Sequence, residues 1–389
     1  MDNAWIAMVM GLLILVATMA SVELGISVAI IEICLGVIAG NFLGLQSTPW
    51  INFLAGFASI LLTFLAGAEV DPVLLQEKWK ESLLIGGFSF LAPFLGAWAF
   101  AWFALGWTSQ ASQIAGVALS TTSLAVVYAV LVETGLTETE IGKIIMASTF
   151  ITDFGTALAL ALLFVQPNWW LIPFILVSVV IIVAMRRLHP WFFARYGNRV
   201  IEPEIKGAFG ALLVLMYFGE KAESHAVLPA FILGLAVAHI LAKHKVQQHR
   251  FRVVAFALLT PFFFIKSGMN ISLRAVLANF AAMALLLGVK LITKLVGVYP
   301  FARRYVPRDA TYTTLLMSTG LTFGTISSLY GLNAGLITQA QFSVLVTVVI
   351  LSAILPTMVA QRCFDPRHRS AAEPDVAPAP ELTPQPEER

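Results

Sequence analysis

Charged residues are scarce in this chain. Asp, Glu, Lys and Arg make up 12% of its 389 residues, whereas hydrophobic residues make up 59%. Soluble globular domains carry about 25% charged residues, so the composition excludes an ordinary soluble domain. Apolar runs of about 20 residues, the length that crosses a bilayer as a helix, recur along nearly the whole sequence. The sequence therefore predicts an all-α polytopic membrane protein.

Residues that build covalent or metal-bound sites are scarce too. The two cysteines, Cys34 and Cys363, offer no disulfide framework and no metal-ligand spacing. No nucleotide-binding loop, metal motif or nucleophilic triad occurs, so we expect neither an enzyme nor a cofactor. The first apolar run has no basic residue ahead of it, which indicates a retained helix rather than a signal peptide.

The apolar runs predict thirteen transmembrane helices. They cover residues 4–20, 25–43, 50–68, 82–104, 111–132, 141–165, 169–185, 207–221, 226–241, 252–270, 275–300, 309–330 and 339–361. Residues 1–361 are therefore expected to form one membrane domain. Residues 362–389 are rich in Pro, Ala and Glu, which predicts a disordered cytoplasmic tail.

Lysine and arginine positions give the predicted orientation. With the N-terminus outside, 19 of the 24 basic residues face the cytoplasm, two face outward and three lie within helices. This asymmetry follows the positive-inside rule. The basic loop at 242–252 is then explained by topology and anionic lipid, and no nucleic-acid partner is predicted. We expect an integral protein of a prokaryotic inner membrane.

Three pairs of stretches match weakly at an offset of 198 to 201 residues. The pairs are Cys34–Asn41 with Ile232–His239, Leu61–Asp71 with Pro261–Ser272, and Leu119–Thr137 with Met317–Thr338. They make residues 207–361 a second copy of residues 1–165, joined by a linker helix at 169–185. An odd number of crossings between equivalent helices inverts the second copy. Inverted repeats are typical of secondary transporters, although shared helix-packing glycines would leave a similar trace.

Asp153 lies in the middle of the run at 141–165. An aspartate at that depth costs about 2.5–3.5 kcal/mol on insertion scales, so we expect it to serve a site or to have a partner. A carboxyl group buried there can hold a proton or a cation, but hardly both. Competition for it would produce cation/proton exchange, with Asp153 as the Na⁺ or K⁺ ligand. The alternative is a purely structural ion pair with a buried lysine.

Hydroxyl residues gather in the range 111–132. Ser120, Thr121, Thr122 and Ser123 are consecutive, and such residues compete with a helix for backbone partners. Their repeat partner, Ser318–Gly324, contains Ser318, Thr319 and Gly320. Both segments predict discontinuous helices that expose backbone groups to an ion, although small residues for close packing are a competing explanation. Thr121, Thr122, Ser123 and the neighbouring Thr152 are candidate ancillary ligands.

Three lysines lie within apolar runs and are candidate counter-charges for Asp153. Lys266 and Lys290 match its depth best, whereas Lys294 is expected to extend toward the cytoplasm. Glu32 and Glu69 are interpreted as caps or interfacial charges.

The chain resembles the monovalent cation:proton antiporter superfamily, in the branch of Kef-type and Nap-type sodium or potassium/proton exchangers. The resemblance covers roughly residues 5–361. It is carried by IEICLGVIAGNFLGL, LLTFLAGAEVDP, ALSTTSLAVVYAVLVETGL, ITDFGTALALALLF, TPFFFIKSGMNISL and KLITKLVG, in this order. Each motif is degenerate alone, but their order and spacing are specific.

This resemblance implies a homodimer in which two crossing unwound helices meet beside an ion-binding aspartate. Asp153 falls on that aspartate, and Ser120–Ser123 and Ser318–Gly324 fall on the unwound segments. Lys290 or Lys294 falls near the membrane-embedded basic residue. The resemblance further implies a role in pH homeostasis.

The chain departs from the family pattern at two points. Electrogenic members have two adjacent acids where this chain has Thr152-Asp153, which predicts electroneutral 1:1 exchange unless a buried lysine also releases a proton. The short tail cannot form the nucleotide-binding domain of potassium-efflux members, so ligand gating within this chain is not expected. A sodium-coupled symporter of a small organic solute is the alternative function, and a non-transporting receptor a third.

Overall fold

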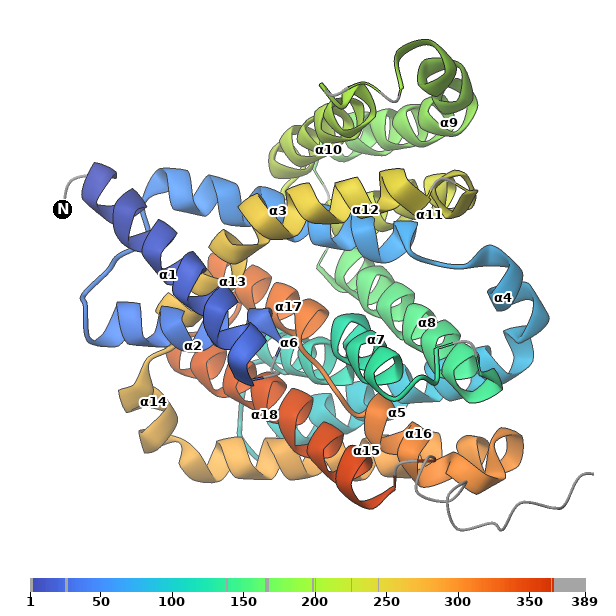
Figure 1. The fold of residues 1–389 in the computed structure, drawn as a ribbon. Coiled ribbons are helices and arrows are strands. Elements are labelled where there is room, and N and C mark those ends of the chain that lie inside the picture. Colours follow the sequence, from blue (N-terminus) through green and yellow to red (C-terminus); the bar gives the residue numbers. More distant parts are fainter. Residues whose placement is uncertain are drawn as a thin grey trace, which may run out of the picture.

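The computed structural model describes residues 3–24, 27–137, 139–164, 168–197, 199, 201–224, 226–243, 245–364 and 366. Every regular element in this part of the chain is helical, which confirms the predicted all-α class (Figure 1). The predicted disordered tail lies outside the described residues from 367 onward. The helices are α1 (Asn3–Leu24), α2 (Val28–Asn41), α3 (Pro49–Ala68), α4 (Pro72–Glu77), α5 (Trp79–Phe103), α6 (Ser109–Ser120), α7 (Leu124–Glu133), α8 (Glu140–Leu163), α9 (Leu171–Tyr196), α10 (Pro203–Lys221), α11 (Val227–Lys243), α12 (Lys245–Val254), the π-helix η1 (Ala255–Leu259), α13 (Thr260–Met269), α14 (Leu273–Ala278), α15 (Phe280–Tyr305), the 3₁₀-helix η2 (Pro307–Asp309), α16 (Ala310–Met317), α17 (Thr322–Asn333) and α18 (Gln339–Cys363).

Nine stretches of the described chain are long and apolar enough to cross a membrane. Each of the thirteen predicted ranges overlaps at least one helix, but α2 and α11 are shorter than a full span. The number of thirteen crossings therefore stays a prediction. Helix α9 continues past residue 185 to Tyr196, through a basic segment that begins at Arg186.

Two helices are broken where hydroxyl and glycine residues predicted discontinuity. Helix α6 ends at Ser120 and α7 begins at Leu124, while α16 ends at Met317 and α17 begins at Thr322. The hydroxyl group of Ser123 caps α7 by accepting a hydrogen bond from the Val126 amide (3.5 Å). Four helix ends therefore meet inside the protein rather than at its surface.

Glycines let the helices of the two halves approach closely. A Cβ atom at Gly67 of α3 would meet the Phe231 carbonyl of α11, and one at Gly234 of α11 would meet the Phe64 carbonyl of α3. The same relation joins Gly36 of α2 to Gly268 of α13, whose Cα lies 3.0 Å from a Cβ built on Gly36. Small residues at such crossings are typical of membrane helix packing.

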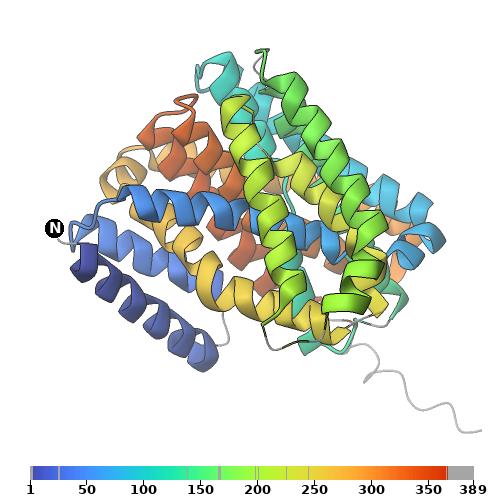
Figure 2. The same ribbon diagram turned by 90° about the horizontal axis from the view of Figure 1, so that it is seen from above.

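Helices α9 and α10 lie at one edge of the molecule, beside α3, α11 and α12 (Figure 1). In the turned view, they cross in front of the other helices (Figure 2). The most apolar stretches of α1 and α9 are only 17% and 11% buried inside the protein. Their exposed apolar faces suit contact with lipid.

Candidate ion-binding site

Asp153 of α8 is buried yet has no fixed partner. The residue is 1% exposed, and its Oδ1 atom lacks a hydrogen-bond partner in the described structure. The ion pairs of the described residues do not include it. The alternative in which Asp153 is locked to a buried lysine is therefore not what the structure holds.

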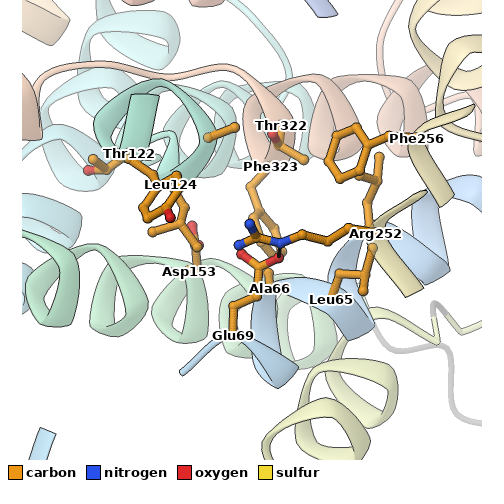
Figure 3. Close-up of a pocket in the computed structure, with 13 residues that line it drawn as sticks. Leu65, Ala66, Glu69, Thr122, Leu124, Asp153, Arg252, Phe256, Thr322 and Phe323 are labelled. Carbon is orange, nitrogen blue, oxygen red and sulfur yellow. Dashed lines mark hydrogen bonds and ion pairs between the residues drawn. The ribbon is translucent and has the colours of Figure 1, made fainter. Parts of the chain in front are cut away.

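The Asp153 side chain faces a cavity of about 300 Å³. Its walls come from α3, α7, α17, the end of α12 and η1, and they are mostly apolar (Figure 3). The lining residues are Leu62, Leu65, Ala66, Glu69, Thr122, Leu124, Ala125, Tyr128, Asp153, Arg252, Phe256, Thr322 and Phe323. We call this the Asp153 cavity.

Thr122, in the break between α6 and α7, joins the Asp153 cavity to the crossing helices. Its hydroxyl group donates to the Met317 carbonyl at the end of α16 (2.9 Å) and accepts a hydrogen bond from Lys294 Nζ (2.9 Å). Lys294 also donates to Ser89 Oγ (2.7 Å). One hydroxyl group thus connects both broken helices and a buried lysine to the cavity that contains Asp153.

The two breaks also touch each other directly. The amide of Ser123 donates to Thr319 Oγ1 (3.4 Å). The C-terminal ends of α6 and α16 carry partial negative charge at this point, and the N-terminal ends of α7 and α17 carry partial positive charge. Buried cations beside the carbonyl ends, such as Lys294 near Met317, are electrostatically favourable.

The three candidate lysines occupy different places. Lys294 is fully buried beside Thr122, so the prediction that it extends toward the cytoplasm is wrong, because Ser89 and Thr122 hold its ammonium group in the interior. Lys290, one turn earlier on α15, is also fully buried, and its ammonium group lies against Gly320 in the second break. Lys266 lines a separate cavity and does not join the Asp153 site.

The other predicted ligands are near the breaks but do not line the cavity. Thr152 donates to the carbonyl of Ser148 (3.0 Å) on its own helix, with Gly86 O of α5 at 3.3 Å. Thr121, Ser318 and Thr319 donate to carbonyls three or four residues earlier in their own helices. Of the predicted residues, only Asp153 and Thr122 line the Asp153 cavity.

Sequence reasoning missed an ion pair in this cavity. Arg252 Nε lies 2.6 Å from Glu69 Oε1, and its guanidinium carbon lies 5.4 Å from the centroid of the Tyr128 ring. Figure 3 shows the guanidinium group extending toward the Glu69 carboxylate, across the cavity from Thr122. Glu69 and Arg252 stand at predicted helix ends, where interfacial charges are common, so their pairing left no signal in the sequence.

The ion pair stands between two chambers. Glu69, Leu124, Tyr128 and Arg252 also line a second cavity of about 390 Å³, whose other walls include Asp71, Lys143 and His249. The orientation predicted from the basic residues would put these polar residues on the cytoplasmic side. A route from that side to Asp153 would thus pass the Glu69–Arg252 pair.

Chemically, the Asp153 cavity offers the Asp153 carboxylate, threonine hydroxyl groups and nearby backbone carbonyls in apolar surroundings, while the Glu69 carboxylate in its wall is paired with Arg252. Oxygen ligands of this kind suit a hard cation, and the carboxylate can equally hold a proton. The described residues contain no group of three or more His, Cys, Asp and Glu side chains that would hold a metal ion. The Asp153 carboxylate can therefore hold either one small cation or one proton.

Comparisons with known proteins agree with this description. Residues 10–362 match the model of the family described as sodium/hydrogen exchanger, transmembrane. A probable Na⁺/H⁺ antiporter 3 from Methanocaldococcus jannaschii is 26% identical over 352 residues, which cover 87% of this chain and 89% of the relative. The Na⁺/H⁺-K⁺ antiporter GerN from Bacillus cereus is 24% identical, over 90% of this chain and 93% of the relative.

The fold has a solved counterpart. The structure of the sodium proton antiporter MjNhaP1 from M. jannaschii at pH 8 superposes with a TM-score of 0.72. The match covers 93% of this chain and 99% of that chain at 16% identity, which shows a shared fold. The relatives are transporters, and the apolar helices mark an integral membrane protein. With the family model matched over residues 10–362, the chain belongs to the sodium/hydrogen exchanger family.

Proposed function

We propose that this membrane protein is a secondary active transporter that exchanges a monovalent cation, Na⁺ or K⁺, for H⁺ by alternating access. The observation that carries the proposal is the buried Asp153 carboxyl group, which has no ion-pair partner and faces the Asp153 cavity. Two relatives, a probable Na⁺/H⁺ antiporter and a Na⁺/H⁺-K⁺ antiporter, support the same reaction.

Competition at Asp153 couples the two ions. A protonated carboxyl group is neutral and binds no cation, whereas an ionised one in apolar surroundings must recover a proton or take up a cation. Thr122, whose hydroxyl oxygen lines the same cavity, is the ancillary ligand that the geometry favours most. Asp153 therefore changes sides with a proton or a cation bound, and each ion is released in exchange for the other.

The charge carried per cycle follows from the number of carboxyl groups. With Asp153 as the sole exchanging group, one proton leaves as one cation binds, and the exchange is electroneutral. Lys294 would change this number only if it released a proton during the cycle. Its Nζ donates hydrogen bonds to the hydroxyl groups of Ser89 and Thr122.

The proposal also includes the oligomeric state, the membrane and the orientation of the chain. We expect a homodimer in the inner membrane of a prokaryotic cell, with the N-terminus outside and the C-terminus in the cytoplasm. The exposed apolar faces of α1 and α9 leave room for lipid or for a second protomer. Cross-linking in native membranes would separate a dimer from a monomer.

The reaction is tested with purified protein in vesicles that contain a pH-sensitive dye. Adding Na⁺, K⁺, Li⁺ or Rb⁺ to vesicles with a preset pH gradient should dissipate the gradient for the transported ions. Asp153→Asn should abolish this dissipation, because an amide binds no exchangeable proton. Glu140→Gln is the control, since Glu140 lies on the same helix at its exposed first turn. Cation-dependent proton movement retained in Asp153→Asn would refute the mechanism.

A further inference from the structure

A third cavity, separate from the Asp153 cavity and from the 390 Å³ cavity beside it, contains the buried Lys266. We call it the Lys266 cavity. It measures about 480 Å³ and is lined by the first half of α3, the end of α10, the turn before α11, Lys266 of α13 and the end of α17. A neighbouring cavity of about 420 Å³ shares Glu220, Ser224 and Asn333 with it. These residues lie at the helix ends that the basic-residue distribution places outside.

The Lys266 cavity and the Asp153 cavity are lined by residues at equivalent positions of the two repeats. Asn52 and Gly56 line the former, while Arg252 and Phe256, each 200 residues later, line the latter. Conversely, Leu65 lines the Asp153 cavity, and Lys266, 201 residues later, lines the Lys266 cavity. The offset changes by one residue across the π-helix η1 (Ala255–Leu259), and a π-turn accommodates one inserted residue.

The two cavities therefore use equivalent positions of α3 and of the α12–η1–α13 segment, from opposite ends. On α3 the lining changes over within one turn, since Ile60 lines the Lys266 cavity and Leu62 the Asp153 cavity. Equivalent positions that line cavities from opposite ends are what an inverted repeat would produce.

Lys266 differs chemically from the residue at the equivalent position of the first repeat. Its side chain is 4% exposed, and it has no hydrogen bond or ion pair with any described residue. The equivalent residue in the Asp153 cavity is the apolar Leu65. An unpaired buried ammonium group repels a cation nearby, and the low dielectric constant of the interior strengthens this repulsion.

We propose that the Lys266 cavity is the outer half of the transport path, and that Lys266 lowers the affinity for cations specifically at the outer face. This inference rests on the proposed exchange reaction. A cation that leaves Asp153 toward the outside would pass the Lys266 ammonium group, which favours release. Glu220 at the rim, exposed and negative, would then draw the released ion onward.

The test compares the two faces of the membrane. Everted and right-side-out vesicles expose the cytoplasmic and the outer face, and the half-saturating Na⁺ concentration is measured in each at the same pH. Lys266→Met should lower that concentration on the order of tenfold at the outer face, because removing a unit charge from the release path changes a binding constant by about that factor. The value at the cytoplasmic face should stay within about twofold of the native one.

Controls separate a local charge effect from a general one. Lys266→Arg keeps the charge and should behave as the native protein does. Lys221→Met removes a positive charge from the outer end of α10 without touching the Lys266 cavity, and should leave both faces unchanged. If Lys266→Met does not reach the membrane, Lys266→Gln replaces it in the same comparison.

Accessibility provides an independent measurement. With Cys34 and Cys363 replaced by serine, Gly56→Cys should react with a membrane-impermeant thiol reagent from the outer face, and Ala66→Cys from the cytoplasmic face. Equal effects of Lys266→Met at both faces, no effect at the outer face, or failure of Gly56→Cys to react from outside would each overturn the inference. A native protein that exchanges no ions would instead refute the proposed function.

Discussion

At the scale of single residues, Thr122 carries more contacts than its place in a hydroxyl run suggests. It donates to Met317 O, accepts from Lys294 Nζ and lines the Asp153 cavity. Thr122→Val keeps the shape but removes these hydrogen bonds and the one shared with Ser89 Oγ (3.4 Å). A buried group left without its partner costs about 1–3 kcal/mol, so we expect a lower unfolding temperature of the purified protein and weaker Na⁺ binding.

The matched control is Thr156→Val on α8. Thr156 is also fully buried, but its hydroxyl group donates only to Thr152 O, one turn earlier on the same helix (2.9 Å). Equal losses of stability in the two variants would mean that Thr122 acts only as a buried polar residue and does not join the broken helices.

The Glu69–Arg252 pair allows a second prediction at this scale. Arg252→Gln leaves the Glu69 carboxylate without its cation at the entrance to the Asp153 cavity. An uncompensated negative charge there should attract cations, so we expect a severalfold lower half-saturating Na⁺ concentration at the cytoplasmic face of vesicles. The double variant Glu69→Gln/Arg252→Gln should return close to the native value.

Arg250→Gln serves as its control. Arg250 lies two residues before Arg252 along the chain and pairs with Glu202 at 2.7 Å. It lines neither the Asp153 cavity nor the adjoining 390 Å³ cavity. If Arg250→Gln changed the Na⁺ dependence as much as Arg252→Gln, the effect would reflect the general surface charge of α12.

The sequence identified Asp153 because a charge in the middle of an apolar run is costly wherever the helix is placed. It could not identify the neighbours of Asp153, since helix rotation and contacts between distant segments decide which side chains share a cavity. Lys294 illustrates this limit. Its distance along α15 suggested a route to the cytoplasm, whereas Ser89 and Thr122, from two other segments, hold its ammonium group inside.

At the scale of elements, both helix breaks were predictable because serine, threonine and glycine weaken a helix locally. The glycine pairs show what was not predictable. Repeat matching relates Gly67 to Gly268 and α2 to α11, but it does not say that Gly67 packs against α11 and Gly268 against α2. A repeat tells which positions are equivalent, and only the three-dimensional arrangement tells which positions touch.

The close crossing of α3 and α11 allows a prediction about stability. In Gly67→Ala or Gly234→Ala, the new methyl group would meet backbone atoms of the facing helix, which cannot rotate away. Overpacking of this kind costs about 1–3 kcal/mol, so each variant should unfold at a lower temperature than the native protein. Gly210→Ala on α10 adds a methyl group where no heavy atom lies within 4 Å, and should be at least as stable as the native protein. A Gly67→Ala variant as stable as Gly210→Ala would show that the helices do not approach closely at this crossing.

At the scale of the whole molecule, the predicted orientation assigns the two cavities to opposite sides of the membrane. The Asp153 cavity continues toward Lys143 and His249, on the side where lysine and arginine concentrate, whereas the Lys266 cavity lies toward the sparsely basic side. The structure thus has its carboxyl site connected to the predicted cytoplasmic side. The membrane potential would act on whatever net charge moves when the site changes sides.

That net charge gives the last prediction. One cation exchanged for one proton moves no net charge, whereas one extra charge per cycle would couple the reaction to the potential by about 2.3 kcal/mol per 100 mV. We therefore expect the Na⁺ gradient that just balances a fixed pH gradient to be the same at positive, zero and negative valinomycin-set potentials, when measured with Na⁺ in proteoliposomes. A balance point that moves with the sign of the potential would mean that a second proton takes part, with Lys294 as its first candidate carrier. Lys294→Gln would then distinguish the cases, because it should remove the voltage dependence only if Lys294 releases that proton.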